Sequence, residues 1–167
     1  KKILSIYDNI PGQLSSGSKK YKLASIDKWA RTQNYENELT WLDEAKIVNL
    51  CHNVTDPSIS LSLTKDETSY KCYQSDVGLL TTQAFINKPF VENEIYKSIL
   101  FGKLNVNEGM IMENYVAQTL KENGYELFYY YKNDNEVIEN NMKIDFLIVQ
   151  DKKLNPIEVK SSNYKKH

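Results

Sequence analysis

The sequence predicts a mixed α+β fold, in which helices and strands occupy separate runs of the chain. Apolar residues recur at helical spacing up to about residue 45 and alternate with polar residues from residue 48. The succession then occurs again, with helical patterns up to residue 123 and strand patterns after it. The chain has 167 residues, of which 41% are hydrophobic and 26% charged, enough for one ordinary domain or two small ones.

The first half is expected to contain three helices and a strand hairpin. The first helix places Ile3, Ile6 and Ile10 on one face and is predicted to end at Pro11-Gly12. The expected elements are helices at 3–10, 25–30 and 35–45 and strands at 48–54, 59–63 and 70–73. This order is typical of a winged-helix unit, which we place at residues 1–85.

The second half, residues 86–167, is expected to start with helices and to finish with strands. Gly124 follows the last periodic residue of the second helix and suits the position just after a helix end. The expected elements are helices at 90–100 and 107–123 and strands at 126–131, 142–149 and 157–160. A polar loop separates the first of these strands from a hairpin formed by the other two.

The charge pattern argues against DNA reading by the winged-helix unit. The net charge is −1, so any nucleic-acid binding must come from a local patch. The helix at 35–45 would be the recognition helix, and it carries Glu36, Glu38, Asp43 and Glu44 without a basic residue. A phosphate backbone repels such a helix, which favours a unit used for packing or protein contact.

Three other patterns favour ordinary structure over chemistry. Cys51 and Cys72 are too few for a zinc site and are predicted to be free thiols. The loop GQLSSGSKK lacks a lysine directly after its second glycine, so it does not match a phosphate-binding loop. No apolar run can span a membrane, which favours a cytoplasmic protein, and the absence of an initial Met suggests a fragment of a longer chain.

Three charged residues interrupt the apolar strands near the end of the chain. Strand alternation groups Asp145 with Leu147 and Val149, and groups Glu158 with Lys160. A turn of about two or four residues makes even-numbered residues face odd-numbered ones. Asp145 is therefore expected on the same sheet face as Glu158 and Lys160.

A fourth charged residue can reach the same place from the helix at 107–123. Asn114, Gln118 and Lys121 are interpreted as its wet side, whereas Glu113 borders the apolar stripe of Val116, Ala117 and Leu120. The predicted Mg²⁺ ligands are Glu113, Asp145 and Glu158, and Lys160 would position a water or offset phosphate charge. The alternative is a set of cross-strand ion pairs on a solvated face.

Nearly the whole chain resembles the domain of unknown function that lies C-terminal to an AAA+ ATPase module in bacterial and archaeal proteins. The matching stretches are IYDNIPGQL (6–14), KLASI (22–26), YENELTWLDEAKIV (35–48), YKCYQSDVGLL (70–80), NEGMIMENYVAQTL (107–120), IDFLI (144–148) and PIEVKSS (156–162). With Asp145 and the element Glu158-Val159-Lys160, the chain also resembles the PD-(D/E)XK nuclease superfamily. Ile144 stands where that motif has proline, and the chain stops at His167, where a nuclease core would continue.

The resemblance implies a winged-helix-like part followed by a nuclease-like core, with ATP bound only by an upstream module. Three functions follow: a Mg²⁺-dependent phosphodiesterase with Asp145, Glu158 and Lys160 as catalytic residues, a nuclease-like scaffold that no longer cuts, or a structural unit for ATPase oligomerisation. The implied partners are the upstream AAA+ module, nucleic acid and a second copy of the chain. The four motif residues favour the first function, and the lack of a strong basic patch in 80–167, apart from KSSNYKKH at 160–167, favours the second.

Overall fold

The computed structural model describes residues 1–17, 20–26, 28, 34–85, 108–133 and 141–160. Its helices are α1 (Lys2–Ser15), α2 (Glu36–Glu44), α3 (Val77–Phe85) and α5 (Glu108–Glu122), with 3₁₀ turns η1 (Leu23–Ser25) and η3 (Leu61–Thr64). Its strands are β1 (Val48–Val54), β2 (Lys65–Gln74), β3 (Phe128–Lys132), β4 (Met142–Gln150) and β5 (Lys153–Ile157). The predicted mixed α+β class is confirmed.

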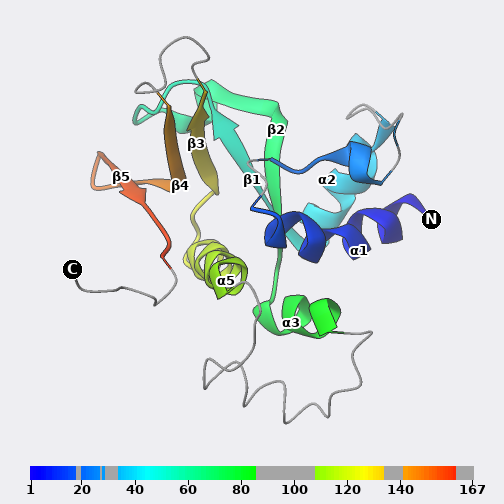
Figure 1. The fold of residues 1–167 in the computed structure, drawn as a ribbon. Helices are drawn as coiled ribbons and strands as arrows, with labels where there is room; N and C mark the ends of the chain where they lie inside the picture. The colour runs from blue at the N-terminus through cyan, green and yellow to red at the C-terminus, as the bar shows by residue number, and fades with distance from the viewer. Residues whose placement is uncertain (18–19, 27, 29–33, 86–107, 134–140, 161–167) are drawn as a thin grey trace.

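The five strands form one sheet in the order β2-β1-β3-β4-β5 (Figure 1). β1 and β3 are parallel, and every other neighbouring pair is antiparallel. The parallel contact is short, with His52 beside Phe128 and Asn53 beside Tyr129. β1 and β2 precede the predicted boundary near residue 85 and β3 to β5 follow it, so one sheet joins the two parts. The boundary itself stays a prediction.

Helix α1 continues past Pro11, where the sequence predicted that it would end. Proline has no N–H, so the carbonyl of Tyr7 loses its helical partner. The side chain of Gln83, from α3, donates a hydrogen bond to that carbonyl at 2.7 Å. A contact across 76 residues of sequence thus satisfies the group that Pro11 leaves open.

The other predicted elements agree in part with the structure. Residues 59–63 were expected to form a strand, but η3 occupies Leu61–Thr64, with Leu61 buried and Ile59 and Leu63 exposed. The alternating pattern of the sequence at 59–63 therefore reflects one buried leucine, Leu61, between exposed apolar residues, and not a strand. Helix α5 ends as predicted before Gly124, whose φ is +82°. The predicted helix at 90–100 and most of the one at 25–30 lie outside the described residues.

The sheet is packed by three groups of apolar side chains. Ile6, Ile10, Leu39 and Leu42 of α1 and α2 pack with Val48 and the β1–β2 hairpin. Helix α5 covers the other side through Ala117 and Leu120, with Tyr129 and Phe146. Val54, Leu61, Phe128 and Leu147 form the third group. In the part of the chain that the structure describes, no helix has both the length and the apolar character needed to cross a membrane.

Both cysteines are buried free thiols, as predicted. Cys51 packs beneath α5 and Cys72 packs on the side of α1 and α2. Burial raises the pKa of both thiols well above the usual value, so they remain protonated at neutral pH. They act as small apolar core residues.

A two-residue turn joins β4 and β5, in agreement with the predicted even-length turn. Phe146 pairs with Ile157 and Gln150 with Lys153, so even-numbered residues face odd-numbered ones. Asp151 and Lys152 have φ values of +52° and +60°. Positive φ at both turn residues is the geometry that suits the twist of a hairpin.

Replacing Lys152 by glycine is expected to stabilise the protein by roughly 0.5–1 kcal/mol, since glycine adopts positive φ without steric cost. Thermal unfolding of the variant measures the gain. Lys153→Gly, one residue further and inside β5, is the control and should destabilise the protein. A loss of stability for Lys152→Gly would contradict the turn geometry.

Candidate functional site

Glu113 lies where the sequence predicted it, on the side of α5 that faces the sheet. Ala117 and Leu120 are buried against Tyr129 and Phe146, and Val116 packs partly against the same group. One turn earlier, the Glu113 side chain crosses to β2, where its Oε1 accepts a hydrogen bond from the hydroxyl of Tyr73 at 2.5 Å. The helix therefore presents a carboxylate over the sheet.

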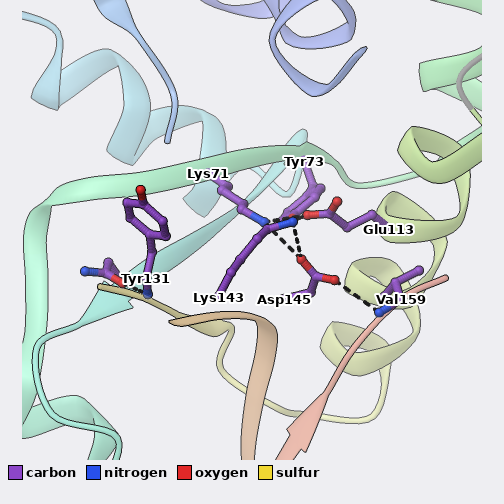
Figure 2. Close-up of polar contacts among 8 residues, drawn as sticks. Lys71, Tyr73, Glu113, Tyr131, Lys143, Asp145 and Val159 are labelled. Carbon is purple, nitrogen blue, oxygen red and sulfur yellow. Dashed lines mark hydrogen bonds and ion pairs between the residues drawn. The ribbon is translucent and has the colours of Figure 1, made fainter. Parts of the chain in front are cut away.

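The closest cation to Glu113 is Lys71, a strand residue that the sequence analysis did not single out. Its Nζ lies 2.6 Å from Glu113 Oε1 and 3.8 Å from Asp145 Oδ1 (Figure 2). The Lys71 side chain is 5% exposed, so this ammonium is removed from water. It also lies 5.2 Å from the centre of the Tyr129 ring, within the range of a cation–π contact.

Asp145 reaches this place because of an irregularity in β4. Phe128 pairs with Leu147, but Tyr130 pairs with Ile144, so β4 advances three residues while β3 advances two. The extra residue is a β-bulge, which re-aims side chains in the longer strand. Leu147 belongs to the apolar group of Phe128, whereas Asp145 points toward Lys71 on the α5 side. The expectation that Asp145 shares a face with Leu147 and Val149 was wrong.

Three groups hold the Asp145 carboxylate, which is 7% exposed. Lys143 Nζ lies 2.9 Å from Oδ1, and the backbone N–H of Val159 donates to Oδ2 at 3.1 Å (Figure 2). Burial raises the pKa of Asp145, but Lys143, the Val159 N–H and the charge of Lys71 outweigh it and lower the pKa overall. The carboxylate is therefore ionised at neutral pH.

Tyr73, which contacts Glu113, and Lys143, which contacts Asp145, both keep the protons that they donate. Burial and the nearby Glu113 raise the pKa of Tyr73 well above its usual value, so its hydroxyl keeps the proton that it donates. Burial lowers the pKa of Lys143, but Asp145, Glu113 and Glu158 raise it overall. Two ammonium groups thus balance two carboxylates. We call Lys71, Tyr73, Glu113, Lys143 and Asp145 the charge cluster.

The structure does not bring Glu158 and Lys160 into the charge cluster. Both follow the end of β5, both side chains are 64% exposed, and they pair with each other at 3.7 Å. Ile157 and Val159 turn toward the α5 side instead, where they pack near Phe146. Glu158 contributes to the cluster through its charge on Lys143.

The donor set of the described residues does not fit a three-carboxylate Mg²⁺ site. Oxygens of Glu113 and Asp145 face Lys71, and Glu158 lies outside the cluster. Among these residues, no three His, Cys, Asp or Glu side chains are close enough together to hold a metal ion. The metal-ligand roles of Glu113, Asp145 and Glu158 remain a prediction.

The side of α5 that was interpreted as solvated makes a second contact with the rest of the protein, through Asn114 and Gln118. Asn114 is fully buried, accepts a hydrogen bond from the Gln74 N–H at 2.8 Å and donates one to the Gln74 carbonyl at 3.0 Å. Gln118 accepts a hydrogen bond from the Val77 N–H at 2.9 Å. The Asn114 amide thus pairs with the backbone at the end of β2, and the Gln118 amide with the start of α3. The interpretation of Asn114 as solvated was wrong, whereas Gln118 is half-buried.

The fold and the charge cluster define a mixed α+β protein with one five-stranded sheet and an internally paired acidic site. The family model of DUF8612, a domain of unknown function, matches residues 1–89, which is just over half of the chain. The chain belongs to this family. The model of DUF4143, also a domain of unknown function, matches residues 108–167. Neither a curated protein nor a solved structure gave a match.

Asp145→Asn is expected to cost on the order of 1–3 kcal/mol at pH 7, because a buried charge-assisted contact is lost. The folded pKa of Asp145 lies below the ordinary value of 3.8, so the stabilisation is present above that value and is lost as pH falls through the folded pKa. The free-energy difference between the wild type and the variant should therefore shrink below about pH 4.

Urea unfolding between pH 7 and pH 2.5 measures this difference. Glu158→Gln is the matched control, since it neutralises a carboxylate that is 64% exposed, and its effect should stay within about 0.5 kcal/mol. An Asp145→Asn difference that is constant over the whole pH range would show that the Asp145 charge has no part in stability.

Proposed function

We propose that this chain is a non-catalytic accessory region of an AAA+ family ATPase, built on a nuclease-like scaffold whose acidic pair is occupied by Lys71. Its role is to bind a partner, either the ATPase module or another ligand, and not to cleave a phosphodiester. The N-terminal part is proposed to be winged-helix-like and to serve packing or protein contact.

The observation that carries this proposal is the position of the Lys71 ammonium between Glu113 and Asp145. A catalytic Mg²⁺ requires carboxylate oxygens with free coordination sites and room for water. Here the ammonium takes that place; the Lys71 and Asp145 side chains are buried, and the Glu113 side chain is 22% exposed. Removing the ammonium would leave a buried and a half-buried carboxylate without the cation that they share, which is costly.

The ATPase setting rests on the resemblance of the motifs. The stretch at 70–80 includes the end of β2 and the start of α3, and residues 108–120 of the next stretch lie on α5. β2 supplies Lys71 and Tyr73 and α5 supplies Glu113, so two of the motif-bearing segments build part of the charge cluster. This supports a structural reason for the motifs that is independent of catalysis.

The second candidate is the Mg²⁺-dependent nuclease. The observation that favours it is the convergence of two carboxylates on one point, since Glu113 and Asp145 both face Lys71 Nζ. This candidate requires Lys71 to withdraw, and it requires Glu158 and Lys160 to leave their exposed positions after β5.

Calorimetric titration of Mg²⁺ and of Mn²⁺ into the chain separates the two candidates. We expect no saturable binding up to about 1 mM, for the wild type and for Asp145→Ala alike, because the ammonium already occupies the acidic pair. Saturable binding by the wild type that Asp145→Ala abolishes would overturn the non-catalytic proposal and favour the nuclease.

A further inference from the structure

A cavity of about 520 Å³ has a described lining that combines two lysines with four hydroxyl-bearing side chains and contains neither an acidic residue nor a member of the charge cluster. Ser16, Gly17, Lys20, Lys22, Ser69, Tyr129 and Tyr131 form this lining. A volume of this size accommodates a small ligand. A smaller cavity, of about 290 Å³, is lined instead by Glu36, Glu67 and His52 among others, so the two cavities differ in charge.

The two lysines are presented to this cavity by an anchored backbone. Between them, Tyr21 is buried, its N–H donates to the Tyr70 carbonyl at 2.7 Å, and its hydroxyl donates to the Ile6 carbonyl at 2.8 Å. The Lys22 N–H donates to Gln13 Oε1 at 3.1 Å. Lys22 has extended backbone angles, and residues two apart in an extended segment share one side. Lys20 and Lys22 are thus held on the side opposite Tyr21.

The ammonium groups of these lysines are available for a ligand. Neither group forms an ion pair with any residue in the described part of the chain, and both side chains are exposed. Two ammonium groups in one wall without a carboxylate match the charge of a phosphate monoester, which is about −1.5 to −2 at pH 7. Lys71 and Lys143, in contrast, are neutralised by Glu113 and Asp145.

The rest of the described lining offers hydroxyls and aromatic rings. Ser69 Oγ and the Tyr129 hydroxyl lie 3.0 Å apart and share one hydrogen bond. Burial, partly offset by Ser69, raises the pKa of Tyr129 to about 12, so its hydroxyl keeps its proton at neutral pH. The half-buried Tyr131 adds a second aromatic side chain to the lining, and aromatic rings stack on nucleobases.

We propose that this cavity binds a nucleotide, with its phosphate on Lys20 and Lys22 and its base against Tyr131. The site goes beyond the proposed function, because its ligand contacts no residue of the charge cluster and needs no metal. The loop that carries the lysines is not a phosphate-binding loop of the strand–loop–helix type, since it follows helix α1. Recognition comes instead from two anchored side chains.

The test is the affinity of the chain for AMP, inorganic phosphate, adenosine and a single-stranded oligothymidylate of about ten nucleotides, all in EDTA. We expect AMP to bind more tightly than phosphate or adenosine alone, because it can contact both the two lysines and Tyr131. Lys20→Ala/Lys22→Ala should weaken AMP binding at least about tenfold. Both alanines retain the backbone contacts of this segment. Lys28→Ala/Lys153→Ala removes equal charge from exposed residues outside the lining and should leave AMP binding unchanged.

Two further arms make the result specific. Tyr131→Ala should weaken AMP binding while leaving phosphate binding unchanged. If the oligonucleotide binds more tightly than AMP, the nucleotide that the cavity takes is part of a nucleic-acid strand. Absence of AMP and oligonucleotide binding, equal losses in both double-lysine variants, or phosphate binding as tight as AMP binding would overturn the proposal. Mg²⁺-dependent cleavage of the oligonucleotide would instead contradict the non-catalytic function and leave the cavity proposal standing.

Discussion

The ion pair between Lys71 and Glu113 is the contact on which the arrangement of sheet and helix depends. It joins a residue of β2 to one of α5 at 2.6 Å, and Asp145 of β4 adds a second carboxylate to the same ammonium. Three elements far apart in sequence are thus tied at one buried point. A buried lysine without carboxylates would be strongly destabilising, and so would two carboxylates without the lysine. Each member therefore requires the others.

The apolar packing and the ion pairs support each other. Ala117 and Leu120 bring α5 against the sheet, which places Glu113 within reach of Lys71, and the bulge in β4 turns Asp145 to the same side. Asn114 fixes the end of β2 from the next position of the helix. Glu113 and Asn114 therefore fix the same turn of α5 to β2 through two neighbouring side chains. This leaves the Glu113 carboxylate little freedom to accept another cation.

Much of the fold could be predicted because its signals are local. Helical spacing identified α2 and α5, and alternation identified β1 and β4, whereas the strand expected at 157–160 is β5 at Lys153–Ile157. The errors arose where a distant residue decides the local structure. Gln83 allows α1 to continue past Pro11, and the unequal advance of β3 and β4 creates the bulge that moves Asp145. Lys71 was missed because a lysine in a strand reads as solvated, and only the placement of α5 buries it.

Lys71 and Glu113 are expected to be energetically coupled, and a double-mutant cycle measures that coupling directly. The free energies of unfolding of the wild type, Lys71→Met, Glu113→Gln and the double variant give the interaction energy of the pair. The expected coupling is about 1–3 kcal/mol, because the Lys71 ammonium is buried and shared with Asp145. Additive effects within about 0.5 kcal/mol would contradict it and would assign the docking of α5 to apolar packing alone.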